Sequence, residues 1–295
     1  IGRMIAGLER PDDGELFYRG KPLKNINDPQ RPDLRREVQM VFQDPFASLN
    51  PRHSVYEIIA GPIRRHHIVP PEDTEKEVNR LLELVGLASD VKYRFPHEFS
   101  GGQLQRIGIA RALSVKPSLI VADEPVSALD VSIQAQILNL FLELQKELDL
   151  TYLFIGHGLP AVNYVSTKVA VMYLGRIVEI APSEILFEKG THPYTRALLE
   201  ALPIPNPHLR GQERLILEGE LPSNIHPPSG CAFHPRCPLA EPSCSVEVPE
   251  IQAANEYPCH CRYSHCLACP VVLRDVKPEV QASATQTKQV EEESV

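Results

Sequence analysis

The chain has 295 residues, enough to bury a sizeable core and to form one large or two modest domains. Its net charge of −8 argues against wholesale nucleic-acid binding. It contains no run of about 18 uncharged apolar residues, so we expect neither a membrane-spanning helix nor a signal peptide. All seven cysteines lie between Cys231 and Cys269, which predicts a cysteine-free body followed by a separate cysteine-rich part.

The N-terminal part combines short elements of different types. Apolar residues at helical spacing open the chain, and turn-forming residues end that pattern at Gly14. The expected elements are a helix over residues 1–8, an antiparallel hairpin over 15–23, a loop over 25–36 and a strand over 38–42. The strand leads to Gln43, whose amide oxygen can bind Mg²⁺ and whose backbone enters a polar loop.

Three helices are expected in the next part of the chain. The first two cover residues 55–66 and 72–85, and Gly86 ends the second. The third, over residues 102–115, follows a serine and two glycines at positions 100–102. Small residues at a helix start leave backbone N–H groups uncovered, and the helix dipole adds partial positive charge there. This helix start therefore predicts a binding site for an anion.

Two adjacent carboxylates follow an apolar run over residues 119–122, which is typical of a buried parallel strand. Asp123, at the carboxyl end of this strand, is suited to bind Mg²⁺. The next residue, Glu124, can hold a water molecule. Together with the helix start at position 100, these carboxylates predict a phosphate and magnesium site.

The rest of the body continues to alternate strands with helices. The expected elements are a helix over residues 131–148, a buried strand over 151–156, a hairpin over 168–181 and a helix over 183–189. We expect the Ser183 side chain to cap the last of these helices. His157 stands directly after the buried strand, a position at which a histidine is on general grounds more often structural than catalytic.

The cysteine-rich part begins after a proline-rich linker. Its first four candidate ligands are Cys231, Cys237, Cys244 and Cys259, with five, six and fourteen residues between them. These spacings fit neither zinc ribbons nor ferredoxins, and thiolates suit iron–sulfur clusters and zinc alike. The remaining cysteines, among them the pair in Cys266-Leu267-Ala268-Cys269, lie outside this pattern. Clustered cysteines in a cytosolic protein favour a metal over disulfides.

Three motifs, in this order and spacing, resemble the signature, Walker B and D-loop motifs of ATP-binding-cassette (ABC) transporter ATPases. They read Phe99-Ser100-Gly101-Gly102-Gln103-Leu104-Gln105-Arg106, Leu119-Ile120-Val121-Ala122-Asp123-Glu124-Pro125 and Ser127-Ala128-Leu129-Asp130. Residues 44–52 resemble the Q-loop of peptide and nickel importers, and residues 191–203 resemble a segment of dipeptide and oligopeptide importer ATPases. The chain is thus similar to the ATP-binding subunits of the peptide importer family.

This resemblance implies an α/β fold of the P-loop NTPase type. We expect an ABC ATPase core with a mainly parallel sheet, an antiparallel β subdomain and an α-helical subdomain, plus a small cysteine-rich module. The expected boundaries are residues 1–202 for the ATPase domain with its helical subdomain at about 51–115, 203–270 for the module and 271–295 for a disordered tail. No G-x-x-x-x-G-K-[ST] pattern occurs, so the resemblance implies a chain truncated just after Walker A. The chain as printed is then expected to be an inactive fragment of an active ATPase.

The resemblance also implies roles for individual residues. Asp123 and Gln43 would bind Mg²⁺, and Glu124 would polarise the water that attacks ATP. His157, which matches the H-loop histidine, would contact the γ-phosphate, although Gly158 stands where the family usually has aspartate. The residues implied to bind the nucleotide are Gln43, Ser100, Gly101, Gly102, Gln103 and Asp130. The four cysteines Cys231, Cys237, Cys244 and Cys259 would ligate a [4Fe–4S] cluster, with zinc as the alternative.

The implied function is ATP-driven import of peptides or related small solutes, at the cytoplasmic face of the bacterial inner membrane. The implied partners are a second ABC ATPase subunit, identical or different, two membrane permease subunits and a periplasmic or extracellular substrate-binding protein, with no nucleic acid. Two other hypotheses stay open at this point. One is a non-hydrolysing subunit that only completes its partner's ATP site, and the other is a soluble, non-transport ABC ATPase with a metal-sensing module.

Overall fold

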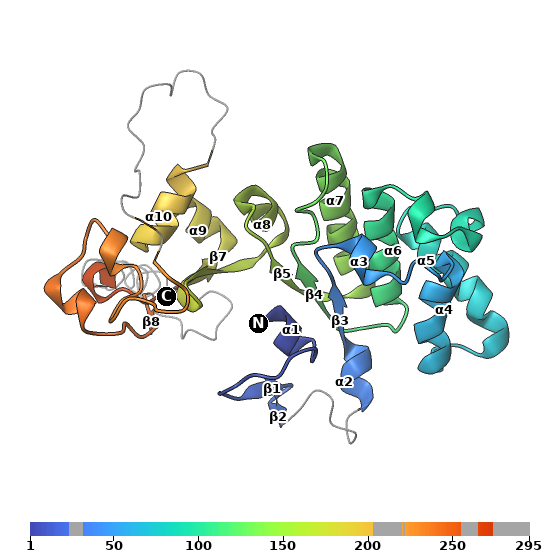
Figure 1. Cartoon of the computed structure of the whole chain (residues 1–295), viewed down its shortest axis with the longest axis horizontal. Coiled ribbons are helices and arrows are strands. Elements are labelled where there is room, and N and C mark those ends of the chain that lie inside the picture. The colour runs from blue at the N-terminus through green and yellow to red at the C-terminus, as the bar shows by residue number, and fades with distance from the viewer. Residues whose placement is uncertain (24–31, 203–219, 221, 255–264, 274–295) are drawn as a thin grey trace, which may run out of the picture. The chain divides into compact units, whose positions relative to one another are not determined.

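The computed structural model describes residues 1–23, 32–202, 220, 222–254 and 265–273 (Figure 1). Contacts within the chain divide it into two compact units, Ile1–Val165 and Ser166–Val295. The sequence-based boundary at residues 202 and 203 lies next to a segment outside the described residues. The hairpin predicted over residues 168–181 belongs by its contacts to the second unit.

A parallel sheet forms the centre of the first unit. Its described strands are β3 (Val38–Val41), β4 (Leu119–Asp123) and β5 (Thr151–Ile155), in the order β3-β4-β5. The middle strand β4 is apolar at four of its five positions and fully buried at its three central residues, as expected for a parallel strand covered on both faces. The three strands point the same way, so their carboxyl ends lie at one edge of the sheet.

Helices of the first unit follow the sequence prediction in most places. The described helices are α1 (Gly2–Ile5), α2 (Pro32–Glu37), α3 (Pro45–Ser48), α4 (Val55–Arg65), α5 (Thr74–Leu84), α6 (Gly101–Leu113), α7 (Val131–Leu148) and α8 (Leu159–Val165), with 3₁₀ turns at Pro71–Asp73, Ser89–Tyr93 and Pro96–Glu98. The helices predicted over residues 55–66, 72–85, 102–115 and 131–148 are confirmed with shifts of at most two residues at each end. A short antiparallel hairpin, β1 (Leu16–Tyr18) and β2 (Lys21–Leu23), is confirmed as well.

Four helices of the first unit differ from the prediction, and the first of them, α1, ends at Ile5 rather than at the predicted residue 8. The loop predicted over residues 25–36 ends in helix α2, because Leu34 is buried and the burial of its side chain favours an ordered turn over a solvated loop. The short helix α3 was not predicted, and the Asp44 side chain caps it by accepting the backbone N–H groups of Phe46 and Ala47 at 2.8 and 3.0 Å. Helix α8 was not predicted either.

The second unit is built on an antiparallel sheet. Its strands are β6 (Lys168–Tyr173), β7 (Arg176–Pro182), β9 (Cys266–Leu267) and β8 (Gln252–Ala253), in the order β6-β7-β9-β8. Helices α9 (Ser183–Lys189) and α10 (Pro193–Glu200) follow, with 3₁₀ turns at His234–Arg236 and Pro242–Ser245. The predicted Ser183 cap is wrong. Ser183 is the first helical residue and is buried, and Pro182 precedes the helix without a capping side chain.

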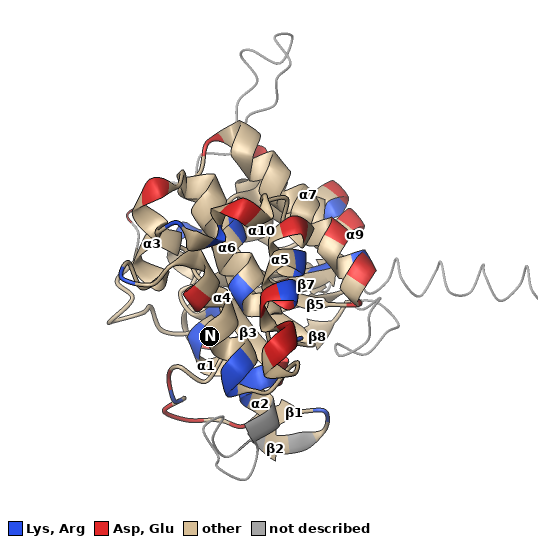
Figure 2. Ribbon diagram, turned by 90° about the vertical axis from the view of Figure 1, so that its right-hand side faces the viewer, with Lys and Arg blue, Asp and Glu red and all other residues tan. Residues whose placement is uncertain are grey.

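Charged residues of both signs cover the helices. The chain holds 30 Lys and Arg residues against 38 Asp and Glu residues, and in the view of Figure 2 the two signs are interspersed. The last turn of α2 carries Arg35 and Arg36, whereas the first turn of α5 carries Glu75 and Glu77. Among the described residues, no helix is both long enough and apolar enough to cross a membrane.

We predict that Phe141→Ala lowers the free energy of unfolding by about 3–5 kcal/mol. Phe141 of α7 is 1% exposed and its ring meets those of Tyr152 and Phe154 of β5 edge to face, at 5.2 and 6.2 Å between centroids. Removing the Phe141 ring leaves a cavity between α7 and β5. Equilibrium denaturation of the intact protein, followed by circular dichroism, measures the change. Val131→Ala on the same helix is the control, because Val131 is 82% exposed.

Candidate functional site

Glu124 lies at the carboxyl edge of the parallel sheet in a constrained backbone conformation. Its φ is +46°, a left-handed value that costs a residue with a side chain about 1–3 kcal/mol. Its backbone N–H donates to the carbonyl of Ile155 at 2.9 Å, which continues the pairing of β4 with β5 by one residue. The backbone N–H and hydroxyl of Ser127 both donate to the Glu124 carbonyl. These bonds fix the direction in which the Glu124 side chain points from the edge of the sheet.

Two side chains from the neighbouring strands meet the Glu124 carboxylate. Gln43, two residues after the end of β3, donates its Nε2–H to Oε2 of Glu124 at 2.7 Å. His157, after β5, places Nδ1 at 3.2 Å from Oε1 of the same carboxylate. The side chain of His157 is 74% exposed and that of Glu124 27%, so the group is open to solvent. Three residues predicted from sequence as parts of one site are thus brought together, and Asp123, half-buried, ends the middle strand beside them.

Arg111 of α6 supports the loop that carries Gln43, a role that the sequence analysis missed. Its Nη1 donates to the backbone carbonyl of Ser48 at 2.6 Å, and its guanidinium lies 5.9 Å from the ring centroid of Phe42. Burial of the side chain lowers the pKa of Arg111 from its ordinary value, but the guanidinium remains charged at neutral pH. Because Phe42 and Ser48 lie on either side of Gln43, one side chain of α6 holds both ends of this loop.

The start of α6 is closed by a reciprocal pair of hydrogen bonds. The Ser100 hydroxyl oxygen accepts the backbone N–H of Gln103 at 3.4 Å, and Oε1 of Gln103 accepts the backbone N–H of Ser100 at 3.0 Å. A Cβ on Gly102 would lie 2.5 Å from Cγ2 of Ile133 on α7, and one on Gly101 would lie 3.4 Å from Cδ2 of Leu129. The approach of α7 therefore requires a glycine at position 102, whereas a methyl group at position 101 would make ordinary van der Waals contact. Asp130 stands at the start of α7 and makes no side-chain capping bond there.

In the second unit, four free cysteines line one cavity of about 440 Å³. They are Cys231, Cys237, Cys244 and Cys269. The Cys231 N–H donates to the carbonyl of Cys244 at 2.8 Å, and Gly230, at φ +65°, allows this approach because a Cβ there would lie 2.4 Å from the same carbonyl. Burial raises the pKa of the Cys237 thiol to about 11, so that thiol is protonated at neutral pH.

The structure adds Cys269 to the predicted set of thiols. Cys231, Cys237 and Cys244 were expected to act together and do line one cavity, whereas Cys259 lies outside the described residues. Cys266, the other half of the C-x-x-C pair, is disulfide-bonded. In the part of the chain that the structure describes, no three or more His, Cys, Asp or Glu side chains are close enough together to hold a metal ion.

Known protein families match parts of both units. The sequence pattern of the ABC transporter family matches residues 1–127, and that of the oligopeptide/dipeptide transporter C-terminal region matches residues 178–244. The oligopeptide transport ATP-binding protein AppF of Bacillus subtilis is 48% identical over 91% of this chain and 80% of its own length. The chain belongs to the oligopeptide-transport ATP-binding proteins of the ABC transporter family.

Two further comparisons extend this assignment. The oligopeptide transport ATP-binding protein OppF of Salmonella typhimurium is 47% identical over 88% of this chain and 79% of its own length. Among solved structures, the ATP-binding cassette MJ0796, a dimer in a post-hydrolysis state bound to ADP and Pi, superimposes with a TM-score of 0.55. That match has 25% sequence identity and covers 62% of this chain and 78% of the other. The predicted family and the ABC ATPase fold, with its parallel and antiparallel sheets and its helices, are therefore confirmed.

For this ABC transporter ATPase we predict that Gly102→Ala destabilises the contact of α6 with α7 by about 1–3 kcal/mol, because the new methyl group collides with Ile133. Gly108→Ala in the same helix is the control. A Cβ there has no heavy atom within 4 Å, so better helix propensity should make it neutral or stabilising. Denaturation of the intact protein measures both changes. An equal effect of Gly102→Ala in an Ile133→Ala background would contradict the steric explanation.

Proposed function

We propose that this subunit hydrolyses ATP to energise the import of peptides or related small solutes, at the cytoplasmic face of the bacterial inner membrane. The observation that carries the proposal is the meeting of Gln43, Glu124 and His157 at the carboxyl edge of β3-β4-β5. The relatives named for oligopeptide transport support the choice of cargo class.

The side chains at this edge suit phosphoryl transfer. When bound with Mg²⁺, ATP supplies a γ-phosphoryl group that water attacks in line, so the protein needs chiefly to position groups and to stabilise charge. The Asp123 carboxylate and the Gln43 amide offer the oxygen ligands that Mg²⁺ prefers. Since Gln43 uses Nε2 to donate to Glu124, its Oε1 is left to accept or to coordinate.

The Glu124 carboxylate is the group we assign to the attacking water. An ionised carboxylate accepts hydrogen bonds at both oxygens, and each Glu124 oxygen has a polar partner, Gln43 on one and His157 on the other. The exposure of the site leaves room for a water molecule to replace one of these partners. We assign His157 to the γ-phosphate, which its exposed imidazole is free to reach from the end of β5.

The start of α6 would serve the nucleotide of a second subunit. Ser100, Gly101, Gly102 and Gln103 form a helix start whose dipole favours an anion, and Asp130 stands at the neighbouring start of α7. The dimeric, nucleotide-bound state of a structural relative supports a pair of such subunits as the working unit. Two membrane permeases and a substrate-binding protein would complete the importer.

The competing hypothesis of a non-hydrolysing subunit is less well supported. Such a subunit does not need an ordered glutamate for water, yet Glu124 is held in a left-handed conformation with partners from two other strands. The relatives do not favour a non-transport ATPase with a metal-sensing module, because proteins named for oligopeptide transport match this chain over most of its length.

We further propose that the thiol cavity holds a metal centre, either a [4Fe–4S] cluster or zinc. Four free thiols from separated segments share one cavity, and soft sulfur ligands suit both metals. Cys231, Cys237 and Cys244 would be three of the ligands, with Cys269 or Cys259 as the fourth. Because burial keeps the Cys237 thiol protonated, metal binding there would release a proton.

The first test concerns Glu124. In the assembled transporter, Glu124→Gln should reduce ATP hydrolysis by about 10²-fold or more while ATP-driven association of the ATPase subunits persists, because the amide keeps the shape but loses the charge that orients water. Phosphate release and nucleotide-dependent dimerisation measure the two effects. Glu143→Gln, an exposed carboxylate on α7, is the control. Turnover close to that of the wild type would refute the assignment.

The second test concerns the thiol cavity. Anaerobic purification followed by iron, sulfide and zinc analysis should find one metal centre in each chain. Cys231→Ser should remove it, and Cys259→Ser compared with Cys269→Ser should identify the fourth ligand, while ATP hydrolysis is retained in all three variants. The proposal fails when none of the three elements is found and all the thiols are alkylated in the folded protein.

A further inference from the structure

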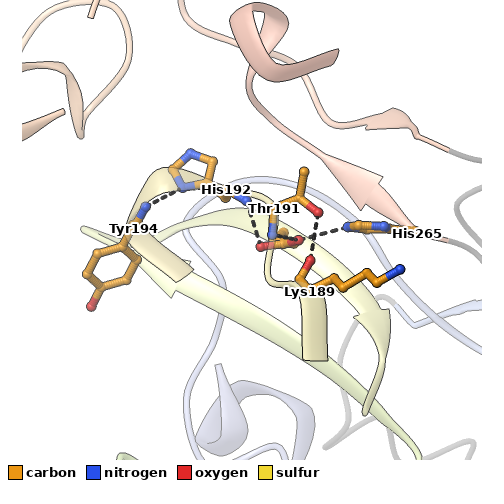
Figure 3. Close-up of polar contacts among 6 residues, drawn as sticks. Lys189, Thr191, His192, Tyr194 and His265 are labelled. Atoms are coloured by element: carbon orange, nitrogen blue, oxygen red, sulfur yellow. Dashed lines mark hydrogen bonds and ion pairs between the residues drawn. The ribbon is translucent and has the colours of Figure 1, made fainter. Parts of the chain in front are cut away.

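A buried carboxylate in the second unit has no place in either proposed site. Glu179 lies in β7 and is 0% exposed. Its Oε1 accepts the backbone N–H of Thr191 at 2.9 Å and faces Nε2 of His265 at 2.8 Å, and its Oε2 accepts the backbone N–H of His192 at 3.1 Å. Figure 3 shows His265, from one segment, close to Thr191 and His192, which lie together in the turn before α10.

These contacts keep Glu179 ionised. Burial alone would raise the pKa of its carboxyl group, but hydrogen bonds from His265 and from the backbone N–H groups of Thr191 and His192 outweigh burial and lower the pKa below its ordinary value. A buried charge is expensive unless hydrogen bonds replace its water, and a packed apolar side chain would avoid that cost. The backbone pairing of β7 does not itself require a glutamate at this position, so a positioning role explains the residue better.

The segments joined by Glu179 also line the thiol cavity. His192 and Pro193 form one part of its lining, and Ala268, Cys269 and Pro270 form another. The His192 ring is itself fixed, because its Nδ1 accepts the backbone N–H of Tyr194 at 3.1 Å (Figure 3). Glu179 therefore contacts the turn before α10 and the segment before Cys269 through a single carboxylate.

The segment that carries Cys269 pairs with β7 over a short stretch, and pairing with β8 and the disulfide bond of Cys266 also hold it. Strand β9 is two residues long, with the register Glu179 to Leu267 and Ile180 to Cys266. One further backbone bond runs from the Ala268 N–H to the carbonyl of Val178 at 2.9 Å. Two-residue pairing is weak by itself, so a charged side-chain contact at the start of this segment adds to what fixes it to β7.

We propose that Glu179 is a positioning residue for the thiol cavity. Its carboxylate joins the segment that ends in Cys269, and the turn that carries His192, to strand β7, and so holds Cys269 at the cavity with the other three thiols. The purpose of this positioning rests on the metal-binding function proposed above. The placement of Cys269 itself can be tested without any metal.

The metal-free test compares the alkylation rates of Cys269 and Cys231 in the intact chain, with iodoacetamide and mass spectrometry. Glu179→Gln keeps the volume of the side chain but turns one acceptor oxygen into an N–H donor that faces other donors. Loss of one hydrogen bond to a charged acceptor changes a local opening equilibrium by about tenfold or more, so the Cys269 to Cys231 rate ratio should rise by that factor. His265→Gln, which leaves the bonds to the Thr191 turn intact, should raise the ratio as well.

Glu188→Gln, an exposed carboxylate on α9, is the matched control and should leave the ratio unchanged. An unchanged ratio in both Glu179→Gln and His265→Gln overturns the proposal. Equal acceleration of the two thiols also overturns it, because the variant would then loosen the whole unit rather than release one segment.

The metal arm uses Co²⁺ alone as a spectroscopic probe of the thiol cavity. The wild type should show the absorption of a four-thiolate site, and Glu179→Gln should show the three-thiolate spectrum given by Cys269→Ser. A Glu179→Gln spectrum identical to that of the wild type overturns the proposal. When the wild type takes up no Co²⁺ but the alkylation ratio still rises, the zinc alternative fails and the positioning role of Glu179 stands.

Discussion

Parallel pairing of β3, β4 and β5 is the constraint on which the proposed ATP site depends. Parallel strands bring their carboxyl ends to one edge, so the residues that follow them must meet whatever their separation in the chain. The bond from the Glu124 N–H to the Ile155 carbonyl extends this pairing by one residue past the strand. It places the carboxylate between Gln43 and His157, which follow the two outer strands of the described sheet.

The sequence marks each member of this site locally, and the resemblance to ABC ATPases adds His157 to the site. Gln43, Glu124 and His157 each follow an apolar run that reads as a buried strand, and parallel order supplies the rest. Arg111 carries no such mark. It reaches the Ser48 carbonyl across 63 positions of sequence, and an arginine on a helix reads as solvated until the partner loop is folded against it. Helix α2 was missed for a similar reason, since only the fold shows that Leu34 is buried.

In the cysteine-rich part, the number of residues between cysteines does not identify which thiols lie together. The resemblance to peptide importer ATPases grouped Cys231, Cys237, Cys244 and Cys259 as ligands, because their spacings alone fit neither zinc ribbons nor ferredoxins. The cavity also includes Cys269, which follows strand β9 where that strand pairs with β7, while Cys259 lies outside the described residues. A two-residue strand leaves almost no signature in sequence, so this return could not be predicted from the pattern of residue types.

Two glutamates at sheet positions show how burial and hydrogen bonding separate chemical from architectural carboxylates. Glu124 is partly exposed and has one partner on each oxygen, so water or a phosphate can exchange with a neighbour at little cost. Glu179 is fully buried and accepts from the segments of Thr191, His192 and His265, so any exchange would leave an unpaired buried group. A glutamate side chain can therefore exchange partners and take part in chemistry at position 124, whereas at position 179 it holds other segments in place. This difference follows from solvent access and donor count, neither of which is visible in the residue type.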